Sequence, residues 1–438
     1  MKILLYGINF VPELTGIGKY TGEMAAWLVA RGHEVRVVTA PPYYPDWAVG
    51  AGYSARTWKR ERWQGVDVWR CPLWVPTRPG GVKRLLHLAS FALGSLPVML
   101  RQIIWRPDVV WVVEPALFCA PAALVLARLS GAKAWLHVQD FEVDAAFDLG
   151  LLRGKFLRGV VAGTERWLMR HFDVVSTISQ RMHQRLLDKG VVPAQAVLSP
   201  NWVDVLAITP GGHSFSAQAG MTAKAAGTTA EAADVTGLEN SFRVKLGIAP
   251  DAVVALYSGN MGGKQGLELL ADVAKLCLAQ AAPAHTAIIF VFCGNGAGRD
   301  DLMRRCAGLP NVHFLELQPI ERLNELLAMG DVHLLPQRAD AADLVMPSKL
   351  TGMLASGRPV LATAHPGTEL ALVVQGCGVV VPPEDPSAMA LAMQALAANS
   401  ILRKQLGEAG RVYALAHLDR EAVLRKFESA LMAVTSKS

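Results

Sequence analysis

Short apolar runs alternate with stretches of helical spacing along almost the whole sequence, and this alternation constrains the fold more than any other feature. In the first half it predicts strands at Ile3–Tyr6, Val35–Val38, Val109–Val113, Ala134–Val138 and Val174–Thr177, and helices at 17–31, 117–130, 155–171 and 180–189. In the second half it predicts strands at Val253–Tyr257, Ile288–Cys293, Val312–Leu315, Val332–Leu335, Val360–Ala362 and Val379–Val381, and helices at 266–280, 300–306, 321–329 and from about 348, followed by two closing helices. Such alternation indicates mostly parallel sheets covered by helices on both faces.

The chain is too long for one domain, and its alternation is interrupted once. Its 438 residues suit two domains. Residues 211–238 are rich in Ala, Gly, Ser and Thr and favour a flexible insertion. We expect a doubly wound α/β domain at 1–203, a linker at 204–240, a second such domain at 241–415, and a C-terminal helix at 416–438 that packs back on the first domain. A ligand cleft is expected between the domains, at the carboxyl ends of their strands.

Composition excludes several classes of protein. Hydrophobic residues make up 52% of the chain and charged residues 18%, which suits large buried cores rather than disorder. The six cysteines form no C-x-x-C pair, which excludes a disulfide scaffold and a thiolate zinc site. The opening MKILLYGINF lacks the apolar core and cleavage site of a signal peptide, so we expect a cytoplasmic location.

Positive charge is concentrated in the first half. Of the 43 basic and 37 acidic residues, 24 and 15 lie in residues 1–200. This balance predicts an anionic partner, and no helix-turn-helix, zinc finger or RNA-binding motif favours nucleic acid. Residues 85–100 are apolar, lie between Lys83, Arg84 and Arg101, and are too short to span a bilayer. They favour either a buried core helix or a helix lying peripherally on an anionic inner-membrane surface.

Three glycine-rich segments follow predicted strands. Glycines let the backbone approach a ligand, and the helix that follows directs free N–H groups toward it. The first segment contains Gly16 and Gly18. It lacks the spacing and the ribose-binding acid of a dinucleotide site, which leaves a phosphate-binding turn or a purely structural turn. The second segment contains Asn260 and Lys264, and the third contains Gly294. Together the three segments indicate a phosphorylated ligand.

Two polar residues stand where a strand of the first domain ends. His137 and Asp140 lie at the end of the predicted strand Ala134–Val138. Strand ends in such folds face the ligand, and a histidine there can bond a sugar hydroxyl or help to move a proton. The alternative is a core histidine whose ring bonds a backbone carbonyl.

A cation and an acid are expected near the phosphates in the second domain. Ser348 stands at a predicted helix start. Lys349 lies in the first turn, where a cation opposes the helix dipole unless an anion binds it; the alternative is a solvated surface lysine. Glu369 follows the strand Val360–Ala362 and is expected to face the same ligand. No D-x-D pair occurs, so we expect no metal and no other cofactor.

Longer blocks of the sequence resemble one enzyme family. The retaining GT-B glycosyltransferases of family four, above all the fucosyltransferases of colanic acid biosynthesis, are similar to this chain in YGINFVPELTGIGKYTGEM, VVTAPPYYP, HVQDFEVDA, YSGNMGGKQGLE and PSKLTGMLA. The resemblance covers nearly the whole chain apart from 211–238. It implies a GT-B fold, in which two Rossmann-like domains face each other across a cleft. It also implies a nucleotide-sugar donor held by the second domain, and a lipid-diphosphate-linked glycan acceptor held by the first.

Departures from the family pattern affect the expected donor site. The family's glutamate pair falls here on Leu344 and Gly352, and its arginine and lysine fall on Asn260 and Gln265, with Lys264 one residue earlier. The family's phosphate and ribose contacts therefore do not transfer as a set. Because the glutamate pair is missing, the hypothesis that the chain is catalytically inactive also stays open.

The resemblance implies a reaction as well. Fucose would pass from GDP-fucose with retained configuration, with His137 and Asp140 as catalytic residues, and the leaving diphosphate would help to deprotonate the acceptor hydroxyl. Two alternatives remain. One is a GT-B transferase with another donor, such as a UDP-hexosamine, and the other is an inactive membrane-associated subunit of a polysaccharide assembly complex.

Overall fold

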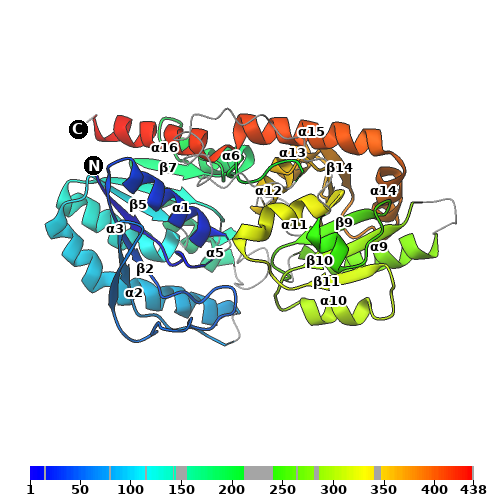
Figure 1. Ribbon diagram of the computed structural model, residues 1–438. Coiled ribbons are helices and arrows are strands. Elements are labelled where there is room, and N and C mark those ends of the chain that lie inside the picture. Colours follow the sequence, from blue (N-terminus) through cyan, green and yellow to red (C-terminus); the bar gives the residue numbers. More distant parts are fainter. Residues whose placement is uncertain are drawn as a thin grey trace, which may run out of the picture. The chain divides into compact units, whose positions relative to one another are not determined.

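The chain is divided into two units (Figure 1, where the colours follow the sequence from blue to red). A computed structural model describes residues 1–13, 16–77, 80–113, 116–141, 143–144, 155–211, 240–262, 265–280, 286–339 and 347–436. The first unit is Met1–Asn201 with Ala422–Ser438, and the second is Trp202–Glu421. Each unit contains one mainly parallel sheet with helices on both faces. The predicted fold class, two doubly wound α/β domains, is confirmed.

The first unit has an eight-stranded sheet in the order β3-β4-β2-β1-β5-β6-β7-β8. Every neighbouring pair is parallel except the edge hairpin β3–β4. The central strand β5 is buried along its whole length, which suits its unbroken apolar sequence VVWVV. The strands are β1 (Lys2–Tyr6), β2 (Glu34–Thr39), β3 (Lys59–Trp63), β4 (Val66–Arg70), β5 (Val109–Val113), β6 (Lys133–Val138), β7 (Val174–Thr177) and β8 (Ala196–Leu198).

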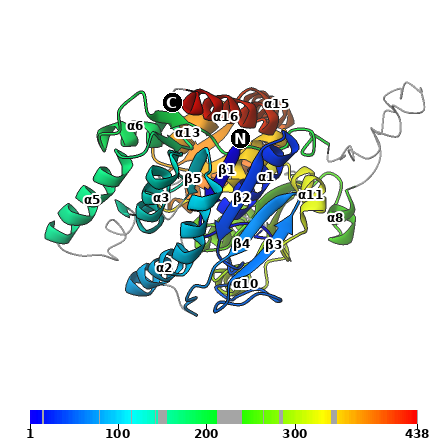
Figure 2. The same ribbon diagram turned by 90° about the vertical axis from the view of Figure 1, so that its left-hand side faces the viewer.

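Helices cover both faces of this sheet, and α1 and α2 lie on its two sides in Figure 2. On one face, the ring of Tyr6 lies 5.8 Å from that of Phe91 in α2. On the other face, Trp111 and Trp135 pack edge-on against Phe427 of α16. The helices are α1 (Ile17–Ala30), α2 (Gly81–Trp105), α3 (Ala116–Ser130), α5 (Lys155–Met169), α6 (Gln180–Asp188) and α16 (Arg420–Thr435).

The second unit has a six-stranded parallel sheet in the order β11-β10-β9-β12-β13-β14. Strand order reverses between β9 and β12, so consecutive connections leave in opposite directions from this point. The strands are β9 (Val253–Ser258), β10 (Ile288–Cys293), β11 (Val312–Leu315), β12 (Val332–Leu335), β13 (Val360–Thr363) and β14 (Gly378–Val381).

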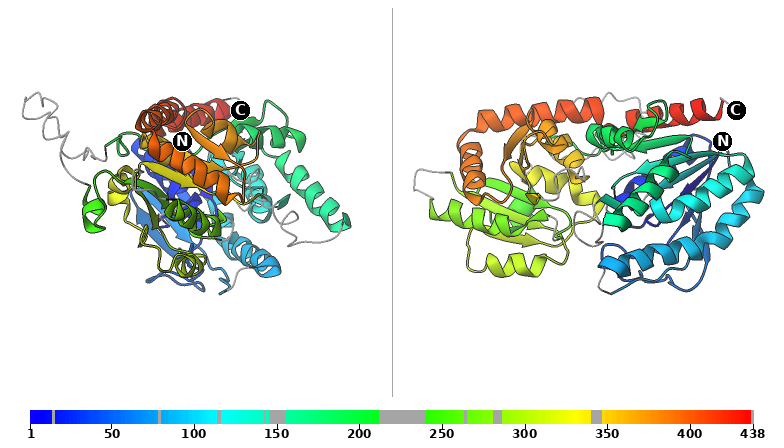
Figure 3. Two further views of the ribbon diagram at one scale, coloured as in Figure 1. Left: turned by 90° about the vertical axis from the view of Figure 1, so that its right-hand side faces the viewer. Right: turned by 180° about the vertical axis from the view of Figure 1, so that it is seen from behind.

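The core of the second unit consists of two apolar layers, one on each face of this sheet. Alternate residues of β9 enter opposite layers: Tyr257 packs with α9 and α14, and Leu256 packs with α8 and α11. Figure 3 (left) shows these helices around the strands. The helices are α8 (Ser241–Lys245), α9 (Glu268–Ala279), α10 (Arg299–Arg305), the 3₁₀ turn η2 (Ile320–Arg322), α11 (Leu323–Met329), α12 (Lys349–Ala355), α13 (Glu369–Val374), α14 (Pro386–Ala398) and α15 (Ser400–His417).

Several features differ from the sequence prediction, and three of them have a local physical reason. The β3–β4 hairpin was not predicted, because the charged edge strand KRERW has no apolar alternation. Val205 and Ile208, which we placed in a linker, are buried in the core of the second unit. Three helices close the chain instead of two, because Asn399 caps a new helix and accepts a hydrogen bond from the backbone N–H of Leu402. The predicted insertion lies outside the described residues, apart from residue 211.

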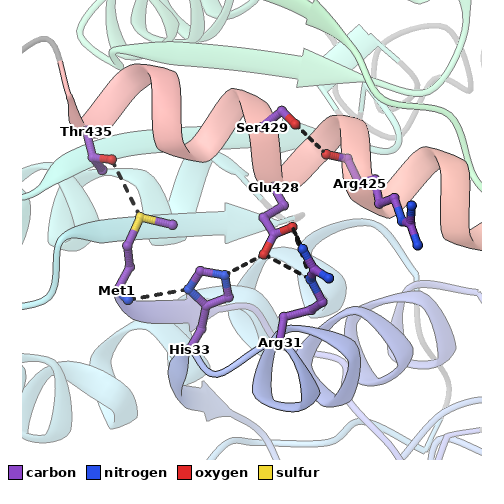
Figure 4. A network of polar contacts seen from close by, with 7 residues as sticks. All are labelled: Met1, Arg31, His33, Arg425, Glu428, Ser429 and Thr435. Carbon is purple, nitrogen blue, oxygen red and sulfur yellow. Dashed lines mark hydrogen bonds and ion pairs between the residues drawn. The ribbon is translucent and has the colours of Figure 1, made fainter.

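Helix α16 is fastened to the first unit by an acid and two bases (Figure 4). The Glu428 carboxylate, only 6% exposed, accepts hydrogen bonds from His33 Nε2 at 2.9 Å and from Arg31 at 3.1–3.3 Å. Burial disfavours ionisation of Glu428, but the hydrogen bonds from His33 and Arg31 outweigh it and hold its pKa below the ordinary value. The carboxylate is therefore ionised near neutral pH and attaches α16 to the end of α1.

We expect Glu428→Gln to loosen α16, because it leaves Arg31 and His33 without their anion. The change should cost about 1–2 kcal/mol of local stability and speed amide exchange in residues 423–434 about tenfold. Since the folded pKa of Glu428 is depressed, protonation at low pH should have the same effect in the wild type: the protection of these amides, taken relative to their intrinsic exchange rates at each pH, should fall as pH drops through that pKa.

Hydrogen-exchange mass spectrometry measures this effect. The control is Glu408→Gln, whose 3.9 Å pair with Lys404 is 66% exposed on the glutamate side and should contribute almost nothing. Equal exchange in both variants would mean that the Glu428 contacts do not hold the helix.

Candidate functional site

The most distinctive side chain in the second unit is a lysine at the point where strand order reverses. Lys349 follows β12 along the chain and begins α12. Its Nζ lies 4.0 Å from the centre of the Tyr257 ring, which β9 supplies from the neighbouring strand. Parallel sheets bind ligands at the carboxyl ends of strands that flank such a reversal. Lys349 and Tyr257 therefore occupy the expected ligand position within this unit.

The ammonium group of Lys349 is buried, and no described residue supplies an anion to it. Its Nζ is enclosed and has no hydrogen-bond partner among the described residues. Burial disfavours the charged form and lowers its pKa to about 7. The face of an aromatic ring compensates only part of the lost hydration of a cation. The site thus has a charge that a phosphate oxygen would complement.

Two glycine-rich turns lie against each other beside this lysine. The N–H of Gly259 donates to the carbonyl of Cys293 at 3.0 Å, and the N–H of Met261 donates to that of Asn295 at 2.9 Å. A Cβ on Gly294 would lie 1.9 Å from the Gly259 carbonyl oxygen, and one on Gly259 would lie 3.5 Å from Lys349 Cδ. The backbone of the β9–α9 turn is thus held next to the lysine stem.

Asn260 lies in the contact between the two turns. Its Oδ1 would be 2.6 Å from a Cβ on Gly296, and its carbonyl accepts a 2.6 Å hydrogen bond from the Tyr257 hydroxyl. Asn260, Gly294 and Lys349, which we predicted as donor-site residues, are therefore brought together through shared neighbours. Lys264, the fourth predicted residue of this group, lies outside the described residues.

The other two predicted residues of the second unit are at helix starts. Ser348 precedes α12, and its hydroxyl makes no capping hydrogen bond; its carbonyl accepts one from Thr351. Glu369 is the first residue of α13, whose cap is the preceding Thr368. Glu369 is half-buried.

The glycine turn of the first unit surrounds a buried carboxylate. Glu13 accepts hydrogen bonds from Asn9 at 2.8 Å and from the N–H groups of Tyr43 and Tyr44 at 3.1 Å. Burial raises the pKa of Glu13. A Cβ on Gly18 would lie 2.9 Å from Glu13 Cβ, so Gly18 is needed for this packing. Gly16 precedes α1 with φ 61° and has open space around it.

His137 is part of a buried polar network at the end of β6. Its ring stacks on Trp111 at 5.2 Å, Nδ1 lies 2.8 Å from Ser176 Oγ, and Nε2 accepts from the Gln139 amide at 3.2 Å. Burial lowers its pKa to about 3, so the ring is neutral near neutral pH. The structure thus gives His137 side-chain partners instead of the backbone carbonyl that we weighed. Asp140 is half-buried, two residues beyond β6.

Some features of these sites were not visible in the sequence. The sequence analysis did not identify Tyr257 and Glu13 as site residues, although both lie within glycine-rich segments. Nothing in the local sequence indicates that Tyr257 packs against Lys349, or that Glu13 is buried against residues 43–44. Leu344 lies outside the described residues, and Gly352 lies inside α12. Within the described ranges, no group of three or more His, Cys, Asp or Glu side chains is placed to hold a metal ion.

Comparison with known families matches each unit to a different sequence family. Residues 15–202 match the glycosyl transferase 4-like domain. Residues 252–399 match the glycosyl transferases group 1.

One relative covers nearly the whole chain. The Escherichia coli (strain K12) protein named "Putative colanic acid biosynthesis glycosyl transferase WcaI" is 43% identical over 436 residues, which are 98% of each chain. Among solved structures, sucrose-phosphate synthase from Thermosynechococcus elongatus superposes with a TM-score of 0.73 at 16% identity, over all of both chains. Anabaena Alr3699/HepE in complex with UDP-glucose gives 0.66 at 15% identity, over 99% of this chain and 100% of that one. Both structures share the GT-B fold predicted from the sequence.

We expect Gly294→Ala to destabilise the second unit severely, because its methyl group would overlap the Gly259 carbonyl oxygen at a backbone φ of 146°. The cost should be at least about 3 kcal/mol. The control is Gly308→Ala, at φ 80° with nothing within 4 Å, which should cost only about 1–2 kcal/mol. Urea unfolding followed by circular dichroism measures both. Equal losses would show that the two turns are not in contact.

Proposed function

The chain belongs to the glycosyltransferase family formed by a glycosyl transferase 4-like domain and a group 1 domain, and from this premise we propose that it moves fucose from GDP-fucose, with retained configuration, onto a lipid-diphosphate-linked glycan. The pathway we propose is the synthesis of an exopolysaccharide like colanic acid. The relative named for colanic acid biosynthesis supports this choice, since its identity extends over 98% of both chains. The choice of fucose rests on the sequence resemblance.

The observation that carries the proposal is the buried Lys349 ammonium. A donor diphosphate has anionic oxygens that can pair with Nζ, and the enclosed position makes that pairing stronger than it would be in water. The β9–α9 turn beside it contains Gly259, next to the lysine stem, and a glycine lets the backbone approach a ligand closely. Lys264 stays a predicted second phosphate ligand, and Ser348 and Glu369 stay predicted donor contacts.

The chemistry we propose needs no metal ion and no nucleophilic carboxylate. The bond between the sugar's anomeric carbon and the β-phosphate oxygen breaks, and a bond to the acceptor oxygen forms on the same face. The acceptor hydroxyl proton goes to the departing phosphate. Negative charge grows on the diphosphate as the bond breaks, so Lys349 stabilises the transition state more than the bound donor. The cation thereby does what a bound metal does in other transferases.

His137 has a limited role in this scheme. A ring with a pKa of about 3 is neutral at working pH and cannot serve as a general acid. We propose instead that it fixes the orientation of Gln139, which also donates to Asn201 at 3.2 Å. Asp140 remains a predicted catalytic residue, and Gly18 packs against Glu13 in the turn that Gly16 and Gly18 were predicted to form around the phosphates.

The proposed function predicts which donor the protein uses. Purified protein, given lipid-linked oligosaccharide extracted from membranes, should turn over GDP-fucose and not UDP-hexosamines or dTDP-sugars. EDTA should leave the rate unchanged, and NMR of the product should show the anomeric configuration of the donor. Turnover with a UDP-hexosamine alone would show that the donor is a UDP-hexosamine and not GDP-fucose. Tight nucleotide binding with no turnover of any donor would indicate an inactive subunit.

The proposed function also predicts the effect of removing the Lys349 cation. Lys349→Met should weaken GDP-fucose binding about 10- to 150-fold, because a charge-assisted hydrogen bond to phosphate contributes roughly 1.5–3 kcal/mol. The melting temperature of the free protein should stay level or rise, since a buried unpaired charge is removed. Lys275→Met is the matched control, because that lysine is 48% exposed on α9 of the same unit. Unchanged affinity in Lys349→Met would show that the donor phosphates do not bind at this site.

The same lysine should make donor binding depend on pH. Its pKa of about 7 in the free protein means that the ammonium form, which binds phosphate, disappears as pH rises. The dissociation constant for GDP-fucose, whose diphosphate stays ionised, should rise about 20-fold between about pH 6.5 and pH 8.5. Calorimetry should find this slope in Lys275→Met and lose it in Lys349→Met. A flat profile in the wild type contradicts an ammonium that titrates in this range.

A further inference from the structure

Helix α2 turns an apolar face away from the first unit. Six large apolar side chains recur along it at intervals of three, four and seven residues, which places them on one side of a helix. Ile104 is 86% exposed and Leu93 is 68% exposed. The six are Val82, Leu86, Leu93, Leu96, Leu100 and Ile104. We call this set the α2 stripe.

The opposite face of α2 is fixed in the core of the first unit. Phe91, Ser95 and Gln102 are buried, and Ser95 Oγ lies 2.7 Å from the Tyr6 hydroxyl. Among the described residues, α2 is the helix long and apolar enough to cross a membrane by length and composition. A helix with one face packed on β1 cannot be surrounded by lipid, so crossing a bilayer would require unfolding this unit. Its geometry fits a helix lying along a surface, as the long light-blue helix of Figure 3 (right) does on the first unit.

Basic and aromatic side chains border the α2 stripe. Lys83 and Arg101, eighteen residues or five helical turns apart, are exposed on the same flank of the helix, and the helix contains no acidic residue. Two exposed tryptophans lie beside the helix: Trp58 donates from Nε1 to the Gly94 carbonyl at 2.9 Å, and the N–H of Trp74 donates to Ser90 at 2.8 Å. Tryptophan and lysine or arginine around an apolar face are the residues that favour a membrane interface.

We propose that the α2 stripe docks the first unit on an anionic lipid bilayer, with the apolar side chains in the acyl boundary and Lys83 and Arg101 at the phosphates. Charge decides between this occupant and a second copy of the chain. Two α2 faces brought together would oppose the same cations, whereas anionic headgroups complement them. This docking goes beyond the donor chemistry proposed above and shares with it only the lipid-linked acceptor.

The test uses full-length protein and sedimentation with vesicles of phosphatidylcholine mixed with phosphatidylglycerol. Leu93→Gln/Ile104→Gln should lower the vesicle-bound fraction at least about tenfold, because it removes two apolar side chains from the buried face. The matched control is Leu391→Gln/Ile401→Gln in the second unit, at 64% and 70% exposure, which should bind as the wild type does. Both variants change only exposed positions and should keep their melting temperature.

A second pair separates charge from apolar contact. Lys83→Gln/Arg101→Gln should bind more weakly and lose much of the salt dependence, whereas Arg304→Gln/Lys404→Gln, at 78% and 79% exposure, should not. The proposal is overturned if the wild type fails to sediment at low salt, if it sediments equally with pure phosphatidylcholine, or if the stripe variant binds normally. A dimer in analytical ultracentrifugation that the stripe variant abolishes, without vesicle binding, would assign the face to a second copy. Calorimetry with GDP in solution should be unchanged in all four variants, so loss of docking and loss of donor binding are separate results.

Discussion

A buried ammonium group to which no described residue supplies an anion is the constraint on which the site of the second unit depends. Burying a cation is costly unless a negative group compensates it, and proteins normally shift its pKa or pair it. Lys349 does the first: its pKa is lowered to about 7, and its Nζ lies over the face of the Tyr257 ring, 4.0 Å from the ring centre. An arrangement that disfavours the charged lysine in the free protein is well suited to a ligand that supplies the missing anion.

The described backbone around the lysine is closely packed for reasons that lie in the sheet. The reversal of strand order between β9 and β12 brings Tyr257 and Lys349 together from segments about ninety residues apart. The contact of Gly294 with Gly259 leaves no room for a side chain and fixes the neighbouring turn. In the first unit, Glu13 and the His137–Gln139–Asn201 chain do the same for loops at the ends of β1 and β6. Both units thus place polar groups at strand ends on closely packed backbone.

The sequence predicts the strands well, and the burial of individual side chains poorly. Val109–Val113 and Ile288–Cys293 agree residue for residue, because each strand is an unbroken apolar run inside a covered sheet. The edge strand Lys59–Trp63 was not predicted because its charged residues show no apolar alternation. Val205 and Ile208 were placed in the linker because the core residues against which they pack lie far along the chain. Lys349 was predicted as a phosphate ligand from its place in a first helical turn. Its burial against Tyr257 depends on strand order, which no local pattern reveals.

The central claim is that Lys349 receives the donor diphosphate, and a crystal structure of the protein with GDP tests it most directly. The account predicts a phosphate oxygen about 2.7–2.9 Å from Lys349 Nζ, with the Tyr257 ring still beneath the lysine. A GDP molecule bound elsewhere, with Nζ still lacking an anion, would contradict it.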